Sequence, residues 1–209
     1  MLIKCITVGA LETNCYVVAD EQSMDCAVID PGADASTILD YLEETHLRCR
    51  FVLLTHGHFD HTGAVSDILA EMDAQLMMHK ADVGVSVGGD YYRFVPPEGT
   101  KYVAEGDVIC VGALSFTVIE TPGHTPGGIC LLCSEQGSDD RALFSGDTLF
   151  RDSCGRTDFP GSSTEDILRS LKRLAELPGD CEVYPGHGFP TTLDRERSLN
   201  YFMAAALRQ

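Results

Sequence analysis

The chain has 209 residues, of which 44% are hydrophobic, and a formal net charge of −17. This length suits one domain, spanning 1–209, that buries roughly 70% of its unfolded surface. We expect neither nucleic acid nor a membrane as a partner, because the chain has no basic stripe for phosphates and no apolar run near ~18 residues.

Strand-like and helical patterns alternate over the N-terminal part of the chain. Short apolar runs predict strands at 2–8, 14–19, 26–30, 51–54 and 75–79. Apolar residues at helical spacing predict one helix capped by Ser36 and a second that begins near Val65. Residues 51–54 are apolar without interruption, so we expect that strand to be covered on both faces. Residues 1–8 have the pattern of a strand and lack that of a signal peptide, which favours a cytoplasmic location.

The second half begins with an irregular region, 84–106, which is either a mobile loop over a site or a long connection. Strands resume at 107–111, 114–120, 128–133, 141–144 and 182–184. A helix opens at the capping box Ser162-x-x-Glu165, and a last helix contains Phe202. Helices therefore lie outside two runs of mostly hairpin-connected strands, and this order predicts a layered α/β or α+β domain.

Nine cysteines without an export signal indicate reduced thiols and not a disulfide framework. Cys130 and Cys133 have the C-x-x-C spacing, but in a strand their side chains point to opposite faces. No second pair completes a zinc ribbon, so we assign these two residues no metal.

The segment Thr55-His56-Gly57-His58-Phe59-Asp60-His61 carries the chemistry that stands out in this sequence. It places three histidines and an aspartate directly after an apolar strand. Imidazole nitrogen and carboxylate oxygen are ligands that zinc and similar divalent metals prefer. Packing has no use for these side chains, whose burial without partners would be costly. We therefore predict a metal site at the end of this strand.

Three further ligand candidates follow in short loops that contain Gly or Pro, and they are His124, Asp147 and His187. The complete set can hold two divalent ions about 3.5–4 Å apart. The first ion is expected to bind His56, His58 and His124. The second is expected to bind Asp60, His61 and His187. The bridging ligand would be Asp147. Zinc is the expected metal, although iron and manganese accept the same ligands.

This ligand pattern resembles that of the metallo-β-lactamase superfamily, whose signature T-H-x-H-x-D-H is followed by a His, an Asp and a His. The match at Thr55–His61 and at the three downstream positions extends over nearly the whole chain. The resemblance implies a four-layer αββα sandwich with two β-sheets inside and the metal ions at one edge. It also implies that Asp30, after the third strand, orients a ligand histidine, and such partners are expected on physical grounds.

Several positions of this chain differ from the patterns of other branches of the superfamily, and these differences disfavour the activities of those branches. β-Lactamases of the zinc type commonly carry Cys at the position of Asp147, which disfavours antibiotic hydrolysis. Flavodiiron proteins carry Glu at the position of His58, which disfavours an oxygen or nitric oxide reductase. The chain is also too short for the nuclease branch with its inserted domain.

The segment from Leu149 to Phe159 resembles the glyoxalase II branch, the hydroxyacylglutathione hydrolases. In that branch a Lys after C-G helps to hold glutathione, and Arg156 has this position here. Asp158 replaces the Tyr of the pattern, and the chain ends before the C-terminal helical domain of the full-length enzyme. The resemblance therefore implies a short hydrolase similar to glyoxalase II, in which Arg156 contacts the substrate.

The predicted reaction is cleavage of a small-molecule thioester, such as S-lactoylglutathione, by a hydroxide that bridges two metal ions. The ions would stabilise the tetrahedral oxyanion. The thiolate leaves readily, because the pKa of a thiol is about 8.5. Asp60 and Asp147 are the expected catalytic residues, since they hold the ions that activate the hydroxide. The sequence indicates no oligomeric state.

Three alternatives stay open. A persulfide dioxygenase of the same superfamily has a stretch that Cys154–Phe159 resembles, and its single iron would bind His56, His124 and Asp147. A lactonase would cleave esters instead of thioesters. A metal-binding domain without enzymatic activity is disfavoured by the bridging aspartate, because structural zinc sites usually place four Cys or His around one ion.

Overall fold

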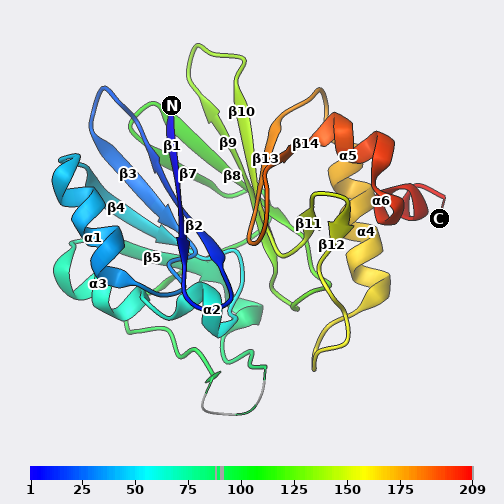
Figure 1. Cartoon of the computed structure of the whole chain (residues 1–209), viewed down its shortest axis with the longest axis horizontal. Helices are drawn as coiled ribbons and strands as arrows, with labels where there is room; N and C mark the ends of the chain where they lie inside the picture. The colour runs from blue at the N-terminus through cyan, green and yellow to red at the C-terminus, as the bar shows by residue number, and fades with distance from the viewer. Residues whose placement is uncertain (88, 90–91, 209) are drawn as a thin grey trace.

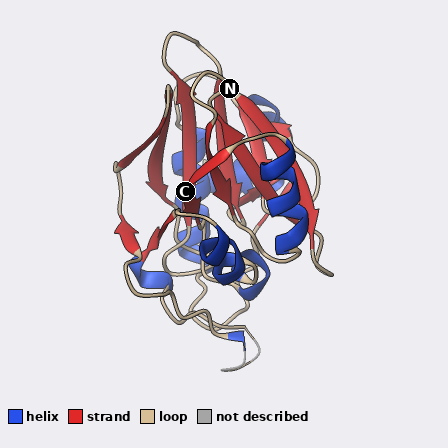
Figure 2. Ribbon diagram, turned by 90° about the vertical axis from the view of Figure 1, so that its left-hand side faces the viewer, coloured by secondary structure: helices blue, strands red, loops and turns tan. Residues whose placement is uncertain are grey.

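A computed structural model describes residues 1–87, 89 and 92–208. Two six-stranded β-sheets face each other at the centre, and helices cover the outer face of each (Figure 1). Figure 2 shows the strands of the sandwich from the side, with helices outside them. This is the layered α/β domain that the order of elements predicted, in the four-layer αββα form that the resemblance implied.

The first sheet contains the N-terminal strands in the order β1-β2-β3-β4-β5-β6. Its strands are β1 Leu2–Val8, β2 Thr13–Ala19, β3 Asp25–Ile29, β4 Arg48–Leu53, β5 Gln75–His79 and β6 Lys101–Val103. β1, β2 and β3 are antiparallel, whereas β3 to β6 are parallel. Parallel neighbours need crossover connections, and helices α1 (Ala35–Glu44) and α3 (Val65–Glu71) lie in two of them.

The second sheet contains the C-terminal strands in the order β14-β13-β10-β9-β8-β7. Its strands are β7 Val108–Val111, β8 Leu114–Glu120, β9 Ile129–Glu135, β10 Arg141–Gly146, β13 Glu182–Pro185 and β14 Thr191–Thr192. β10 and β13 are parallel and are connected through α4 (Thr164–Ala175). The remaining elements are α2 Phe59–Thr62, a 3₁₀ turn Lys80–Asp82, β11 Leu149–Phe150, β12 Ser153–Cys154, α5 Leu193–Leu199 and α6 Tyr201–Ala206.

Three apolar layers hold the sandwich together. The middle layer lies between the two sheets and includes the fully buried Phe116. The outer layers include Ile38 of α1 on the first sheet and Leu171 of α4 on the second. Cys130 packs in the layer under α4 and Cys133 in the middle layer, so their side chains point to opposite faces of β9 as predicted. All nine cysteines are free.

The region 84–106 is less irregular than its sequence indicates. Strand β6 lies inside it and pairs with β5 as the parallel edge strand of the first sheet. Because β6 has only three residues, no alternating pattern marks it in the sequence. Residues 88, 90 and 91 of this region lie outside the described residues.

The ends of three helices differ from the prediction. Helix α4 is capped by Ser163 and not by Ser162, since the Ser163 hydroxyl accepts a hydrogen bond from the Asp166 N–H. Helix α1 begins one residue before Ser36 and has no side-chain cap. The predicted C-terminal helix is divided into α5 and α6 at Asn200. Among the described residues, no helix is long and apolar enough to cross a membrane.

The C-terminal ends of several strands meet at one edge of the sandwich. β8, β10 and β13 run in the same direction, because β10 is parallel to β13 and both β8 and β10 are antiparallel to β9. The loop after β4 joins the same edge, where the Ile129 N–H donates to the carbonyl oxygen of Thr55. Loops that are distant in the sequence are therefore neighbours here.

Candidate metal centre

All seven predicted metal-binding side chains meet at this edge. They come from the loop after β4, from the short helix α2 and from the loops after β8, β10 and β13. Helix α2 begins at Phe59, so it separates the two histidines of the preceding loop from Asp60 and His61. The side chains divide into two groups, as the sequence predicted.

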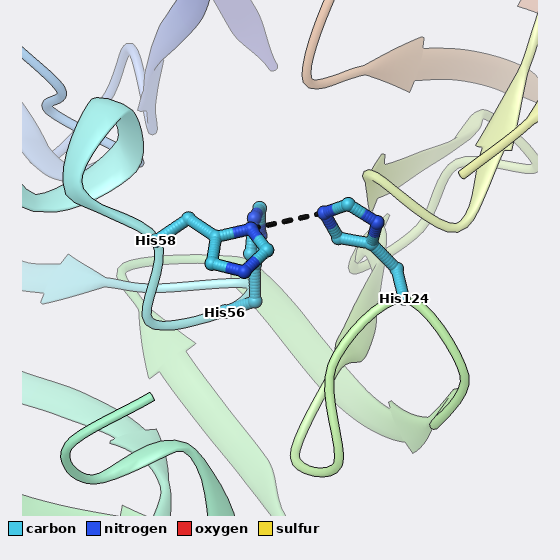
Figure 3. Close-up of side chains that lie close together, drawn as sticks. All are labelled: His56, His58 and His124. Carbon is cyan, nitrogen blue, oxygen red and sulfur yellow. Dashed lines mark hydrogen bonds between the residues drawn. The ribbon is translucent and has the colours of Figure 1, made fainter. Parts of the chain in front are cut away.

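The first group consists of His56, His58 and His124, which are 3%, 5% and 6% exposed. One nitrogen of each ring lies within 4.8 Å of the others, which is close enough for the three residues to hold one metal ion. Figure 3 shows His58 and His124 facing each other, with Nδ1 of His58 3.0 Å from Nε2 of His124.

The second group consists of Asp60, His61 and His187, and its ligand atoms also lie within 4.8 Å of one another. Oδ2 of Asp60 is 3.3 Å from Nε2 of His187 and 3.6 Å from Nε2 of His61. A combination of Asp30 with His56 and His61 satisfies the same distance limit. However, Asp30 already accepts hydrogen bonds from Thr55 and lies beside Nδ1 of His61, so we assign it an orienting position.

Asp147 lies between the two groups. Its Oδ1 atom is 3.5 Å from Nε2 of His61, and its Oδ2 atom is 3.4 Å from Nε2 of His124. A third contact, of 3.8 Å, joins Oδ2 to Nε2 of His187. One carboxylate thus reaches histidines of both groups, which is the geometry expected of a bridging ligand.

Several buried polar atoms of these groups have no hydrogen-bond partner. They are Nε2 of His56, Nε2 of His61 and Oδ1 of Asp147. An unpaired buried polar atom is costly, and buried polar groups in native proteins are nearly always satisfied. Metal ions would satisfy these atoms, and the set of imidazole and carboxylate donors suits a divalent ion such as zinc. The residues present therefore fit the metal that the sequence predicted.

The protonation of His56, His58 and Asp60 also suits cations. Burial, together with His124 and His61, lowers the pKa of His58 to about 3. Burial and the adjacent histidines hold the pKa of His56 well below its usual range. Burial opposes ionisation of Asp60, but the hydrogen bond from His187 and the charge of His61 outweigh it and lower the pKa of Asp60 to about 2. Neutral imidazoles and an ionised carboxylate are the forms that bind metal. In the second group, burial opposes protonation of His61, but Asp147 and Asp30 outweigh it and raise the pKa of His61 to about 9, so this ring has to release a proton when an ion binds.

Four of the five histidines are oriented through the Nδ1 atom. The partners are the Thr55 hydroxyl for His56 at 3.1 Å, an Asp30 carboxylate oxygen for His61 at 2.9 Å, the Arg156 carbonyl oxygen for His124 at 2.9 Å and the Leu11 carbonyl oxygen for His187 at 3.1 Å. Such partners fix the ring and leave Nε2 for a metal ion. Asp30 thus lies where the resemblance implied.

Asn14 also supports this site, although no motif in the sequence marks it. Its side-chain amide donates to the carbonyl oxygens of Pro185 and Gly188, on either side of His187. The Asn14 N–H donates to the Gly186 carbonyl oxygen. These bonds attach the His187 loop to the start of β2. The contacts span more than 170 positions in the chain, so no local pattern marks them.

A cavity of about 480 Å³ borders both groups. Its apolar lining consists of Leu11, Phe59, Val87, Phe150 and Phe159. The Arg156 guanidinium also lines it, 4.1 Å over the ring of Phe159, and pairs with both carboxylate oxygens of Asp158. Burial raises the pKa of Cys154, a further lining residue, to about 11, so this side chain is a protonated thiol.

The fold is a four-layer sandwich, and two groups of histidine and aspartate side chains at one edge of it can bind metal ions. Together they define a metal-dependent class of protein. The sequence match makes the class specific: residues 8–187 match the metallo-β-lactamase superfamily. The chain therefore belongs to this superfamily, and the superfamily and the similar proteins support a metal-dependent hydrolase.

Three similar proteins bear on the activity. The hydroxyacylglutathione hydrolase GloC of Haemophilus influenzae is 32% identical, and the alignment covers 97% of this chain and 98% of GloC. The structure of BLEG-1, a B3 metallo-β-lactamase, superposes with a TM-score of 0.84 at 30% identity, covering 97% of this chain and 99% of that one. TTHA1623 in a di-iron-bound form has a TM-score of 0.81 at 34% identity and coverages of 95% and 99%.

Proposed function

We propose that the protein is a hydrolase that uses two divalent metal ions to cleave small-molecule thioesters. The observation that carries this proposal is the position of Asp147, whose two carboxylate oxygens lie within 3.5 Å of a histidine from each group. From this position one side chain can serve two ions. Zinc is the metal we expect, and iron and manganese are the alternatives. The di-iron form of TTHA1623 supports iron among these.

When bound, the ions supply Lewis acidity to a substrate carbonyl and lower the pKa of a water molecule. The chain itself contributes charge and position. Asp60 and Asp147 are the proposed catalytic residues, because they place negative charge beside both groups. Thr13 donates a hydrogen bond of 3.4 Å to Asp60 and holds this carboxylate against the second group. The apolar side chains of the cavity wall would displace water from a bound substrate, and fewer water molecules would strengthen these electrostatic interactions.

A thioester suits the side chains that line the cavity. Among the described lining residues, the carboxyl groups are Asp60 and Asp147, both of which we propose as metal ligands. No carboxylic acid is therefore left in this part of the site to protonate a departing amine. A thiolate needs little protonation, since the pKa of its thiol is about 8.5. The similarity to GloC also favours a thioester.

Arg156 is the proposed contact for the thiol carrier of the substrate, since it lines the cavity beside His124. The composition of the chain supports our proposal that neither nucleic acid nor a membrane is a partner. The net charge of −17 argues against nucleic acid and anionic membranes. Nine free cysteines are consistent with the reducing cytoplasm, where we place the protein.

A persulfide dioxygenase is the second candidate. His56 and His124 lie in one group, and Asp147 is 3.4 Å from His124, so these three residues can also hold a single iron. A lactonase would use the same two groups as the thioesterase. The three candidate activities share metal-binding residues, so a test of substrates distinguishes them better than the identity of these residues does.

Elemental analysis of the purified protein, combined with an activity screen, tests the proposal. We expect two equivalents of metal and faster hydrolysis of thioesters than of matched lactones or oxygen esters. A single iron with oxygen uptake that depends on a persulfide would replace the proposal with the dioxygenase. Preferential turnover of lactones would instead identify the third candidate.

A further inference from the structure

Asp82 is a charged side chain in the interior that none of the roles above explains. It ends the 3₁₀ turn after β5 and is 0% exposed. A buried carboxylate is costly unless it is well hydrogen-bonded. The partners of Asp82 therefore indicate why the fold places a charge here.

Both carboxylate oxygens of Asp82 bind the loops that carry the first group. Oδ2 accepts hydrogen bonds of 2.8 Å from the Gly57 N–H and 2.8 Å from the Thr125 hydroxyl. Oδ1 accepts a hydrogen bond from the Gly127 N–H. Gly57 lies between His56 and His58, and Thr125 follows His124. One carboxylate thus joins the loop after β4 to the loop after β8.

Gly57 and Gly127 both lie very close to Asp82, and each position is too narrow for a larger residue. A Cβ atom on Gly57 would lie 2.6 Å from the carbonyl oxygen of Asp82. A Cβ atom on Gly127 would lie 2.7 Å from both the nitrogen and Oδ1 of Asp82. Neither position has space for a side chain. The loops therefore approach Asp82 closely enough for its carboxylate to set the distance between them.

The distance between these loops determines how the first group meets an ion. His56 and His58 come from one loop and His124 from the other, so no single loop can form the group. Asp82 contacts the two loops through the Gly57 N–H, the Thr125 hydroxyl and the Gly127 N–H, and none of these groups belongs to a ring. Residues that hydrogen-bond a ligand side chain typically change metal affinity by about 10–100-fold when they are removed, and we expect an effect of the same order from a residue that holds the ligand loops.

We propose that Asp82 is a positioning residue that sets the affinity of the first group for its metal ion by holding the two ligand loops together. Its effect is confined to this group, because among the described residues its carboxylate accepts hydrogen bonds from Gly57, Thr125 and Gly127 and from no residue of the second group. The inference rests on metal binding in the proposed function and not on thioester cleavage.

Zinc titration of the metal-free protein against a chelator of known affinity tests this proposal, since it measures the two binding steps without activity. In Asp82→Asn, an amide nitrogen replaces one acceptor, and we expect one step to weaken by about 10–100-fold and the other to change little. Thr125→Val removes one donor of the same cluster and should weaken the same step to a smaller extent. This milder variant keeps the test decisive if Asp82→Asn folds poorly.

A His187→Ala background assigns the step, because this variant keeps only the first group complete. In this background, Asp82→Asn should still lower the affinity for the one remaining ion. Asp20→Asn is the matched control: Asp20 is 3% exposed and accepts hydrogen bonds from Gln22, Ser23 and Ala113, beyond the far end of β2. Asp20→Asn should lower the free energy of unfolding without changing the affinity of either zinc-binding step.

Three outcomes would overturn the inference: unchanged zinc affinity in Asp82→Asn, equal weakening of both steps, or the same loss in Asp20→Asn. The failure of the proposed function is a different result. A wild-type protein that binds no divalent metal would refute both proposals. Metal binding without thioester cleavage would refute only the assignment of the substrate.

Discussion

Oδ2 of Asp30 lies 2.9 Å from Nδ1 of His61 and also accepts a hydrogen bond of 2.6 Å from the hydroxyl of Thr55. The other oxygen, Oδ1, accepts from the Thr55 N–H at 2.7 Å. Because the Thr55 hydroxyl is in turn 3.1 Å from Nδ1 of His56, one buried carboxylate orients a histidine of each group. Asp30 therefore contributes to the geometry of both.

Asp30→Ala should weaken metal binding by about 10–100-fold, with the larger effect on the second group, because His61 loses a direct partner and His56 only an indirect one. The protein should also lose stability, since a buried Thr55 N–H is left unpaired. Zinc titration and chemical denaturation measure the two effects. Asp34→Ala removes an exposed aspartate from the same loop, and with it a hydrogen bond from the Gly9 N–H, so it serves as the control for metal affinity and not for stability. Wild-type affinity in Asp30→Ala would contradict the orienting role.

The sequence marks the candidate ligands more clearly than it marks the residues that support them. Thr55–His61 has no packing explanation, and the loops of His124 and His187 each combine Gly, Pro and His, so their chemistry is visible locally. Asp82 is a single aspartate whose partners lie 25 to 45 positions away. No pattern in the sequence marks such a residue, because its function depends on contacts that exist only in the folded chain.

Helix α4 shows why local signals could not place every boundary. Ser162 and Ser163 are each followed three residues later by an acidic residue, so both fit the pattern of a cap. The fold selects Ser163, whose N–H donates a hydrogen bond of 2.8 Å to the carbonyl oxygen of Gly123. The tertiary contact decides between two serines that the local sequence leaves equivalent.

Asp147→Ala should reduce kcat by more than about tenfold and lower the metal content of both groups, because its carboxylate lies beside a histidine of each. Steady-state kinetics and elemental analysis of the same preparation measure this. Asp67→Ala, on the surface of α3, is a control for the loss of one negative charge. Near-normal turnover with two bound ions would show that Asp147 does not bridge them.

Arg156→Ala should raise KM for an anionic thioester several-fold and change kcat less, because it removes substrate binding and leaves the chemistry intact. The substitution keeps the Arg156 carbonyl oxygen, so the contact with Nδ1 of His124 is retained. Kinetics with an anionic and a neutral thioester separate a charge effect from a general one. Arg169→Ala, an exposed arginine on α4, is the control. Equal KM values in the wild type and Arg156→Ala would exclude contact with substrate.

The hairpin of β11 and β12 forms one wall of the cavity, and Asn200 holds it from behind. The Asn200 amide donates to the carbonyl oxygens of Phe150 at 3.3 Å and Ser153 at 2.9 Å, and to a carboxylate oxygen of the buried Glu196 at 2.9 Å. Its Oδ1 atom caps α6 by accepting from the Phe202 N–H. The junction between two short helices is thus connected to the substrate cavity.

Asn200→Ala should reduce the free energy of unfolding by about 1–3 kcal/mol, because it leaves several buried polar groups unpaired. The looser hairpin should also raise KM while both metal ions stay bound, since the Asn200 side chain hydrogen-bonds to Phe150, Ser153, Glu196 and the start of α6 and, among the described residues, to neither metal-binding group. Denaturation, kinetics and metal content are measured together, with Ser198→Ala as an exposed neighbour for control. If metal content fell in parallel with stability, the C-terminal helices would support the whole metal centre, and the prediction that Asn200 affects the cavity wall alone would be wrong.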